Sequence, residues 1–303
     1  MNDVKVTVIC LTYNHEAWIR DALESFVDQD VPWPIEVLVH DDASTDRTAA
    51  IVREFESRYP DMIYGFYAPQ NRHSQGIIIS RDILMPYIRG EFVALCEGDD
   101  YWTDPGKLRR QVEALEANPK VDICAHSARR LRPDGQEWND APRAYNCLIP
   151  AEEVILGGGG FVATSSLLVR ASCYKEIPPF REELFNDYSL QIWGSLRGGM
   201  VYLSDFLSVY RQGLPGSWTE QHHGQAHVEY RVLIRNMLRA LDTYTEGKYS
   251  KAIEERIKLY DSDDLASGGH ILSMLKPEQL PTTWQQIRRR FQWLCSQFRR
   301  GRK

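Results

Sequence analysis

Short apolar runs and helical patterns alternate along the first 125 residues of the chain. Runs rich in β-branched and aromatic residues predict strands at Val4–Leu11, Ile35–Val39, Met62–Phe66, Phe92–Leu95 and Val121–Cys124. Between these runs, apolar residues recur at helical spacing over 19–26, 52–59 and 108–115, the last segment after a start signal at Asp104 and Pro105. Such alternation predicts an α/β fold with a mostly parallel sheet flanked by helices.

The rest of the chain is less regular and then becomes helical. A glycine run at 157–160 precedes a strand-like segment, Val162–Arg170, and Tyr188–Leu196 has a helical pattern. Beyond Trp218, apolar stripes run from Tyr230 to Leu241 and from Trp284 to Phe298. We therefore expect one α/β domain over 1–215, with a nucleotide-binding half (1–125) and an acceptor half (126–215), followed by a helical C-terminal region over 216–303.

Composition narrows the class of protein. The chain has 303 residues, 43% of them hydrophobic, and a formal net charge of −6, which is typical of a globular protein and argues against a general nucleic-acid binder. It contains no apolar run of 18 residues and no secretory signal pattern at its start, so we expect a cytoplasmic protein. Its six cysteines show no C-x-x-C spacing, which argues against a zinc or redox site.

Polar residues follow three of the predicted strands, at the edge where ligands bind in parallel sheets. They are Thr12-Tyr13-Asn14, Asp41-Asp42 and the cluster Glu97, Asp99 and Asp100. Adjacent carboxylates repel each other and resist burial, and a divalent cation with oxygen ligands, Mg²⁺ or Mn²⁺, compensates both effects. The alternative is a set of acidic turns, with Ser44 or Thr45 as an ordinary helix cap. Two such clusters in one α/β half favour a nucleotide site.

The segments VTVICLTYNH, VLVHDDASTDRT and RDILMPYIRGEFVALCEGDDYWTDP, in this order and spacing, resemble the inverting family-2 glycosyltransferases with the GT-A fold. The resemblance covers roughly residues 4–215. It implies a nucleotide pocket lined by Thr12, Tyr13 and Asn14, with Asp42 bonded to a uracil or thymine base and Arg81 near the nucleotide.

The same resemblance implies the reactive groups. Asp100 is the expected main metal ligand, with Asp99 beside it facing the ribose or donor sugar, and Glu97 stands where many members have an aspartate. Asp187 is the expected catalytic base, with Glu182 and Glu183 as less favoured candidates. Further along the chain, Arg211 is expected at the diphosphate, and His222 or His223 as an additional metal ligand.

These roles together predict a metal-dependent inverting glycosyltransferase that uses a UDP- or dTDP-sugar donor and a glycan or lipid-linked acceptor in bacterial surface glycan synthesis. One alternative is a nucleotidyltransferase, which normally carries a glycine- and basic-rich phosphate loop that the segment after the first strand lacks. Another is a nucleotide-sugar-binding paralogue without catalysis, against which the presence of Asp42, Asp99, Asp100 and Asp187 together argues.

The end of the chain has a different character. From Arg288 to Lys303 it carries seven basic residues and no acidic one, on a segment whose apolar residues recur at helical spacing. A basic amphipathic helix over 284–303 can lie on an anionic membrane surface, which would place the protein at the inner face of the membrane. The alternative is a terminal helix packed on the domain.

Overall fold

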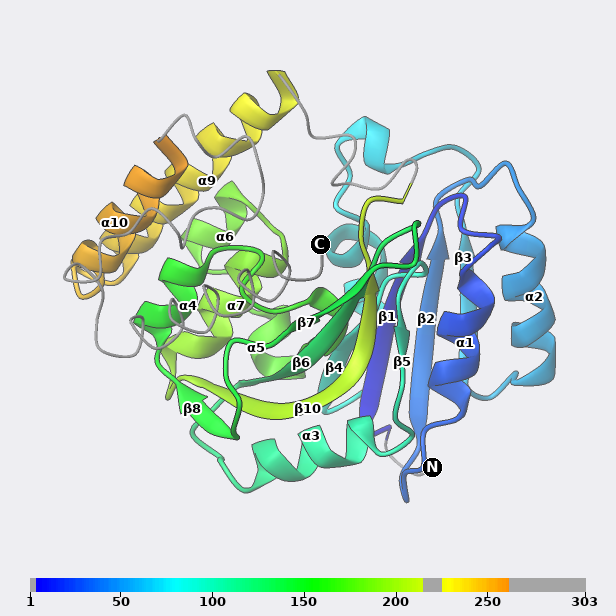
Figure 1. Cartoon of the computed structure of the whole chain (residues 1–303). Helices are drawn as coiled ribbons and strands as arrows, with labels where there is room; N and C mark the ends of the chain where they lie inside the picture. The colour runs from blue at the N-terminus through cyan, green and yellow to red at the C-terminus, as the bar shows by residue number, and fades with distance from the viewer. Residues whose placement is uncertain (1–3, 215–224, 262–303) are drawn as a thin grey trace, which may run out of the picture.

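A ten-stranded sheet forms the centre of the computed structural model, which describes residues 4–214 and 225–261 (Figure 1). Its strand order is β3-β2-β1-β4-β9-β6-β10-β5, with β7 paired to β6 and β8 to β10. The strands are β1 (Val6–Thr12), β2 (Ile35–Asp41), β3 (Ile63–Tyr67), β4 (Phe92–Leu95), β5 (Tyr101–Trp102), β6 (Ile123–Leu131), β7 (Glu137–Asp140), β8 (Cys147–Ile149), β9 (Leu168–Arg170) and β10 (Met200–Arg211).

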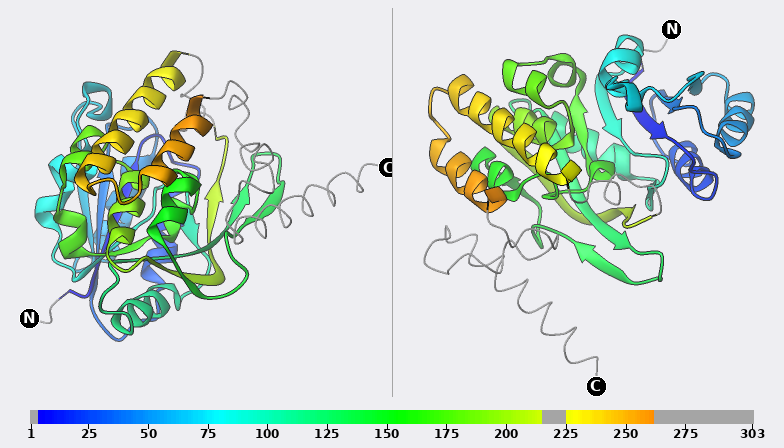
Figure 2. Two further views of the ribbon diagram at one scale, coloured as in Figure 1. Left: turned by 90° about the vertical axis from the view of Figure 1, so that its left-hand side faces the viewer. Right: turned by 90° about the horizontal axis from the view of Figure 1, so that it is seen from above.

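Helices cover the sheet in two groups. In Figures 1 and 2, α1 and α2 lie beside the N-terminal strands, whereas α4, α6, α7, α9 and α10 gather over the other end of the molecule. The α-helices are α1 (Ile19–Val27), α2 (Thr48–Arg58), α3 (Lys107–Glu116), α4 (Ala151–Gly157), α5 (Ala171–Lys175), α6 (Pro179–Glu183), α7 (Asp187–Leu196), α9 (Gln225–Tyr244) and α10 (Ser250–Asp261). Short turns of 3₁₀ or π type are η1 (His73–Gln75), η2 (Ser80–Leu84), η3 (Met85–Tyr87) and η4 (Thr164–Ser166).

The N-terminal half of the sheet, β3-β2-β1-β4, is entirely parallel. The chain runs from β1 out to β2 and β3 on one side and then crosses back to β4 on the other side of β1. The strand order therefore reverses between β1 and β4, and ligands of open α/β sheets bind beyond the carboxyl ends of the strands at such a point. The predicted clusters of polar residues follow β1, β2 and β4, so they meet at this edge.

The second half of the sheet is mixed. Strand β9 pairs antiparallel with both β4 and β6, whereas β10 runs parallel to β6 and antiparallel to β5 and β8. The pairing of β10 with β6 changes register between Leu203 and Ser208, which is typical of a β-bulge. The last residues of β10 lie beside β5, directly after the acidic cluster of β4.

Two hydrophobic clusters pack on the two faces of the sheet. Alternate residues of one strand serve both clusters: Ile9 packs with α4, α7 and α9, whereas Val8 packs with α1, α2 and α3. The inward face of α9, with Ile234, Met237 and Leu238, is completely buried in the first of these clusters. The described part of the C-terminal helical region thus shares a core with the sheet domain.

The α/β fold expected from the sequence is confirmed, and most strands of the N-terminal half lie within two residues of their expected bounds. Three local expectations were wrong. Only Leu168–Arg170 of the strand-like segment 162–170 is a strand. Asp104 was expected to start the third helix, but α3 begins at Lys107 and its N-cap is Gly106. The Asp104 carboxylate instead accepts a hydrogen bond from the amide of Gly106 in the turn before the helix. Leu233, expected in the buried stripe, is 43% exposed.

The proposed domain boundary at 215–216 and the stripe at 284–298 lie outside the described residues. Within 4–214 and 225–261, no helix is both long enough and apolar enough to cross a membrane.

Candidate active site

The loops after β1 and β2 hold each other through a set of short hydrogen bonds. The amide of Asn14 donates to Ser44 Oγ (2.9 Å), and Asn14 Oδ1 accepts from the amide of Thr45 (2.8 Å). Asn14 and Ala43 both have positive φ angles, 55° and 63°, so both loops turn sharply at the sheet edge. Ser44 and Thr45 therefore connect two loops and do not cap α2, whose N-cap position is Arg47.

Asp42 is 3% exposed and organises a third segment of the chain. Its two carboxylate oxygens accept hydrogen bonds from the amides of Arg72 (2.7 Å) and His73 (3.0 Å). The carboxylate expected to bond a nucleotide base thus also fixes the loop before η1. Carboxylate oxygens each have two lone pairs, so these bonds leave acceptor capacity for a further donor.

The end of β1 lies against the acidic cluster. Thr12 is buried, and its hydroxyl has no hydrogen-bond partner among the described residues. A Cβ atom on Gly98 would come within 2.8 Å of that hydroxyl, so glycine allows the turn after β4 to pack on β1. Tyr13, in contrast, is 41% exposed and presents its ring to solvent beside this edge.

Asp100 is the most deeply buried carboxylate of the cluster, at 1% exposure. Its Oδ1 accepts a hydrogen bond from the amide of Arg211 (2.9 Å), whereas Oδ2 has no well-formed hydrogen bond within the described chain. Burial, together with repulsion from Asp99 and Glu97, raises the pKa of Asp100 well above its usual range, and the nearby Ser165 hydroxyl and the Arg211 amide only partly offset this. An additional positive charge at Oδ2 would stabilise the ionised form.

Glu97 is the first carboxylate of the acidic cluster after β4. Its side chain reaches solvent and has no hydrogen bond or ion pair to the described residues. Enclosure by surrounding protein and repulsion from Asp99 and Asp187 raise the pKa of Glu97. Because the Glu97 side chain is exposed, the repulsion contributes more to its raised pKa than desolvation does. The Glu97 carboxylate therefore interacts electrostatically with a metal-ligand candidate, Asp99, and with the base candidate, Asp187.

Asp187 is the first residue of α7, and its neighbour Asn186 is the N-cap. Asn186 forms a reciprocal capping box with Ser189, so Asp187 is not needed as the cap. The carboxylate of Asp187 accepts hydrogen bonds from the hydroxyl of Thr164 (3.0 Å) and from the amide of Tyr188 (2.8 Å). Burial raises the pKa of Asp187, and these two donors lower it part of the way. The rival candidates Glu182 and Glu183 are exposed.

The two arginines assigned to the donor are held by protein groups. Arg211 donates from Nη1 to the carbonyl oxygen of Asp99 (2.8 Å) and from Nη2 to Asp21, and its guanidinium lies over the ring of Tyr101. Arg81 forms an ion pair with Asp82 and lies 5.7 Å from the ring centre of Phe185, just before the base candidate. Both arginines border the site, and their roles at a nucleotide or a diphosphate stay predictions.

Sequence reasoning missed three polar residues that lie beside these groups. His15 Nε2 is 3.9 Å from Asp99 Oδ2, and burial lowers the pKa of this histidine. Thr164 bonds Asp187, and the next residue, Ser165, faces Asp100. His15 could have been found from its place directly after Asn14, whereas Thr164 lies in a segment that its apolar pattern had assigned to a strand. His222 and His223 lie outside the described residues.

The donor set fits a divalent cation in part. No group of three potential metal-ligating side chains converges within 4–214 and 225–261. However, Asp100 Oδ2 is a buried, unpartnered oxygen next to a second carboxylate, Asp99. Mg²⁺ is commonly held by one or two carboxylates with the remaining ligands from substrate phosphates and water. Asp100 and Asp99 thus suit a cation that a nucleotide diphosphate brings to the site.

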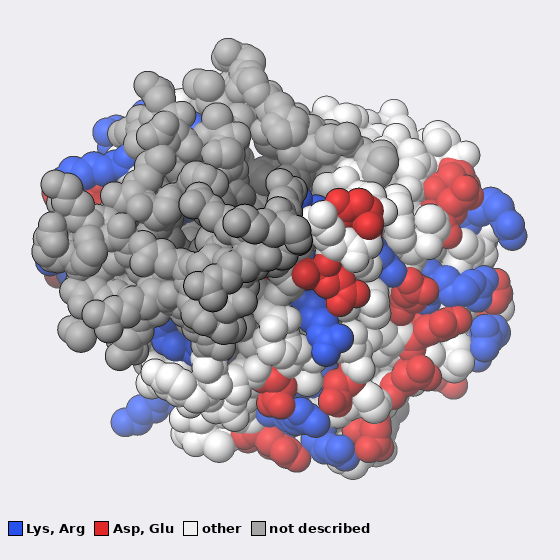
Figure 3. All heavy atoms as spheres, viewed as in Figure 1, with Lys and Arg blue, Asp and Glu red and all other residues white. Residues whose placement is uncertain are grey.

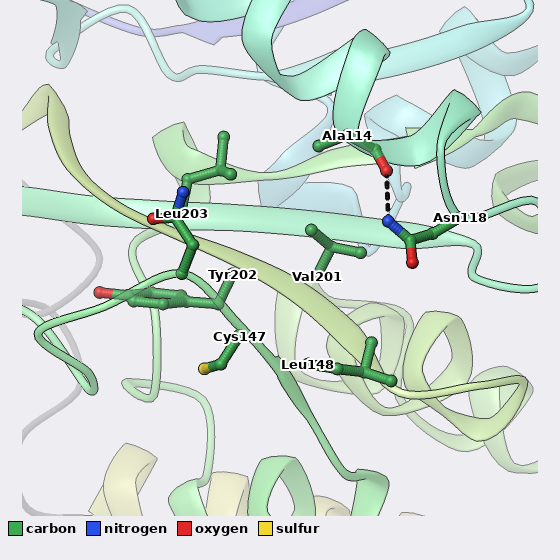
Figure 4. Close-up of a pocket in the computed structure, with 8 residues that line it drawn as sticks. Ala114, Asn118, Cys147, Leu148, Val201, Tyr202 and Leu203 are labelled. Carbon is green, nitrogen blue, oxygen red and sulfur yellow. Dashed lines mark hydrogen bonds between the residues drawn. The ribbon is translucent and has the colours of Figure 1, made fainter.

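Outside this site, we considered a cavity beside α3 and the charged side chains on the surface. A cavity of about 290 Å³ lies between α3, β8 and β10, where Ala114, Asn118 and Cys147 are among the lining residues, and it contains none of the predicted site residues (Figure 4). On the face drawn in Figure 3, the described Lys and Arg side chains are interspersed with Asp and Glu. Neither feature indicates a second site of concentrated charge.

The sheet has a parallel N-terminal half, with paired carboxylates at its switch point, and a mixed second half. A base candidate lies at the start of a nearby helix. This combination is that of a GT-A-type transferase domain. Residues 7–172 match the family model described as Glycosyl transferase family 2. The chain therefore belongs to glycosyltransferase family 2.

The chain is also similar to individual proteins. The chain is 33% identical over 215 residues to an uncharacterized protein of Mycobacterium tuberculosis, a match that covers 70% of this chain and 60% of the relative. It is 34% identical over 99 residues to the poly(ribitol-phosphate) β-N-acetylglucosaminyltransferase TarS of Staphylococcus aureus, covering 32% of this chain and 17% of TarS. The chain thus spans about 60% of the length of the mycobacterial relative.

Solved structures show the same fold. The crystal structure of S. aureus TarS 1–349 with UDP-GlcNAc superimposes with a TM-score of 0.66 and 17% identity, covering 94% of this chain and 79% of that one. The mannosyltransferase PcManGT of Pyrobaculum calidifontis, in complex with GDP-Man and Mn²⁺, has a TM-score of 0.52 and 16% identity, covering 96% and 87%. At these identities the likeness establishes the GT-A fold alone.

Proposed function

We propose that the chain is a metal-dependent, inverting glycosyltransferase that moves a sugar from a UDP- or dTDP-sugar to a hydroxyl of a glycan or lipid-linked acceptor in bacterial surface glycan synthesis. The observation that carries the proposal is one continuous group of carboxylates at the switch point of the sheet. Besides burial, Asp99 and Glu97 raise the pKa of Asp100, and Asp99 and Asp187 raise the pKa of Glu97, so these four carboxylates lie within electrostatic reach of their neighbours in the group. The UDP-GlcNAc complex of TarS and the poly(ribitol-phosphate) named as its substrate support the donor and acceptor classes.

The donor end of the site is the edge formed by β1, β2 and β4. Thr12 presents an unpartnered hydroxyl, Tyr13 an exposed ring, and Asp42 a carboxylate with remaining acceptor capacity for the base imide. Asp100, through Oδ2, and Asp99 would hold a Mn²⁺ or Mg²⁺ ion, and the Mn²⁺ complex of PcManGT supports this type of ligand. When bound, such an ion supplies Lewis-acid stabilisation to the charge that develops on the diphosphate leaving group.

The acceptor end of the site is Asp187. In an inverting transfer, the acceptor hydroxyl attacks the anomeric carbon opposite the diphosphate and loses its proton, which a nearby carboxylate accepts. Each oxygen of Asp187 uses one lone pair for its hydrogen bond from Thr164 or Tyr188 and keeps another for this proton. The raised pKa of Asp187 makes it a stronger base than an ordinary aspartate. In the product state Asp187 is protonated and then returns the proton to water.

A donor screen tests the proposal. The protein is incubated with UDP- and dTDP-sugars and Mn²⁺, with or without candidate acceptors, and released nucleoside diphosphate is measured. We expect release that EDTA abolishes, and a product whose anomeric configuration, determined by NMR, is opposite to that of the donor. Retained configuration or release unaffected by EDTA would contradict the mechanism. In a parallel assay with UTP or dTTP and a sugar 1-phosphate, pyrophosphate release would instead indicate a nucleotidyltransferase. Thermal stabilisation by nucleotide sugars without turnover would indicate a binding protein.

We also propose that the protein acts in the cytoplasm at the inner face of the membrane, where the basic segment 284–303 contacts anionic lipid. The support is its charge and helical spacing in the sequence, since the segment lies outside the described residues. Sedimentation with vesicles of anionic or neutral lipid, using the full chain and a variant with the seven basic residues changed to glutamine, checks this. Equal sedimentation of the two proteins would remove the membrane role.

A further inference from the structure

The turn η4 lies between the two ends of the carboxylate group. Thr164 Oγ1 donates a hydrogen bond to Asp187 Oδ2 at 3.0 Å. The hydroxyl of the next residue, Ser165, donates to Ser208 Oγ (3.2 Å) and lies near enough to the buried Asp100 to lower the pKa of that carboxyl. The two residues are adjacent in sequence, whereas Asp100 and Asp187 are 87 positions apart. A single turn of the chain thus addresses both the metal-ligand candidate and the base candidate.

The turn itself is held firmly. Trp102 Nε1 donates to the carbonyl oxygen of Ser165 (3.0 Å), and Gln111 Nε2 donates to that of Ser166 (2.8 Å). Ser165 and Ser166 are completely buried, whereas the side chain of Thr164 is half-buried at the site. These bonds fix the backbone, so the direction in which the Thr164 hydroxyl donates is set before any substrate binds.

We propose that Thr164 is a positioning residue that orients the Asp187 carboxylate and keeps it in its proton-accepting state. This inference rests on the proposed function, in which Asp187 is the base. A hydroxyl donor stabilises a carboxylate more than a carboxylic acid and fixes the plane of the carboxylate. Without Thr164, the carboxylate would keep only backbone donors: the amide of Tyr188, on the other oxygen, and its own amide.

The surroundings of Asp187 make this donor important. Glu97, at the end of β4, repels a second negative charge at Asp187. From α9, Tyr230 bonds the side chain of the neighbouring Asn186 (2.8 Å) and lies near enough for Asp187 to raise its pKa. No ion pair to Asp187 is present within the described chain, so the charge is compensated by hydrogen-bond donors, of which the Thr164 hydroxyl is the side-chain one.

A titration that does not depend on turnover tests the inference. The carboxyl carbons of aspartate are labelled with ¹³C, the Asp187 resonance is assigned by its loss in Asp187→Asn, and its midpoint is followed by NMR in metal-free protein. We expect Thr164→Val to raise the Asp187 midpoint by about one pH unit, which corresponds to a tenfold change in the ionisation equilibrium. Thr164→Ser, which keeps the hydroxyl, is expected to titrate like the wild type. An unchanged midpoint in Thr164→Val would overturn the inference.

Kinetics then connect the titration to the reaction. The acid limb of the kcat profile should move upward by the same one pH unit in Thr164→Val, so that kcat on that limb falls about tenfold and recovers as the pH is raised, with the donor KM unchanged. Thr245→Val is the matched control, because the hydroxyl of Thr245, just after α9, donates to the carbonyl oxygen of Leu241 in that helix, away from the site. A pH-independent loss of kcat would contradict the inference. A wild type without any transfer would refute the proposed function, and the NMR result would still decide the inference.

Discussion

The two halves of the molecule contribute to the site in different ways. In the N-terminal half, three parallel strands deliver their following residues to one edge, so that Thr12, Asp42 and Asp100 meet because their strands are neighbours. In the second half, Asp187 reaches the same place through a capped helix and a bond from a separate turn. The first arrangement follows from sheet topology, whereas the second depends on individual side chains.

This difference predicts how each half responds to change. Asp99 and Asp100, after β4, are buried and repel each other, so their arrangement costs stability and is suited to binding a cation. Asp187 is stabilised by its own hydrogen-bond donors. Removing the base or these hydrogen bonds therefore changes proton transfer and leaves the site of the nucleotide sugar intact. Loss of donor binding from a change at Asp187 would show that the two ends are not separate.

The largest expected effect is that of Asp187→Asn. An asparagine keeps the shape of the side chain but cannot accept the proton, so kcat should fall by about 10²- to 10⁴-fold. Donor affinity, measured by calorimetry with Mn²⁺, should stay within about twofold of the wild type. Glu182→Gln is the control, because Glu182 is an exposed carboxylate and the less favoured candidate for the base. This variant should keep its activity. Near-normal turnover in Asp187→Asn would remove Asp187 from the role of base.

The second prediction concerns the donor end. Asp100→Asn should weaken binding of the nucleotide sugar in Mn²⁺ by about tenfold or more. Such an ion is held by only one or two carboxylates, and Asp100 would lose its charge. In metal-free protein the same variant should be at least as stable as the wild type at pH 7. The raised pKa of Asp100 means that the folded state disfavours its ionised form, and asparagine removes that penalty.

Calorimetry with and without Mn²⁺ measures the first effect of Asp100→Asn, and urea unfolding in EDTA measures the second. Asp205→Asn is a matched control, since Asp205 is an exposed carboxylate on β10. Donor binding that is independent of Mn²⁺ in the wild type, or equal in wild type and Asp100→Asn, would contradict the assignment of Asp100.

The same contrast explains how far the sequence could be interpreted. The strand Phe92–Leu95 was predicted at its observed bounds because a parallel strand covered on both faces is a continuous apolar run with polar residues at its end. The carboxylates were found for the same reason. The GT-A fold class, too, was available from three motifs in order.

The second half could not be predicted in this way. Strand β10 was missed because its two buried runs, 200–203 and 207–209, are separated by an open stretch that includes Ser204 and Asp205 near its bulge. Segment 162–170 was apolar because most of it packs around the turn η4, not because it pairs as a strand. The contact between Thr164 and Asp187 joins residues 23 positions apart through tertiary structure, and no local pattern indicates it.

A third prediction concerns Lys107, at the start of α3. Its side chain is completely buried, its amine lies 3.8 Å from the ring centre of Trp102, and it has no hydrogen-bond partner among the described residues. Burial lowers the pKa of Lys107 to about 7. Lys107→Met, which keeps a flexible apolar side chain of similar length, should raise the free energy of unfolding at pH 7 by about 1–3 kcal/mol.

The pH dependence of this effect has a definite sign. The unfolded lysine binds a proton below about 10.4, whereas the folded one releases it above about 7, so the lysine penalises folding most at or below pH 7. The stability difference between Lys107→Met and the wild type should therefore shrink as pH rises from 7 to 10. Urea unfolding at pH 7, 8.5 and 9.5 measures it, and a difference that is constant with pH would show that the amine is not the cause.

The smallest expected effect separates the cap of α7 from the base that follows it. Asn186→Ala removes the side chain that accepts from the amide of Ser189, and loss of such a cap costs about 1 kcal/mol of stability. Because Asp187 keeps its bonds from Thr164 and Tyr188, kcat should fall by less than tenfold, far less than in Asp187→Asn. Asn118→Ala, which removes a side-chain amide that follows α3 and donates to the carbonyl oxygen of Ala114 in that helix (Figure 4), is the matched control for stability. If Asn186→Ala lost as much activity as Asp187→Asn while remaining folded, the base would depend on the helix cap and not on the turn at Thr164.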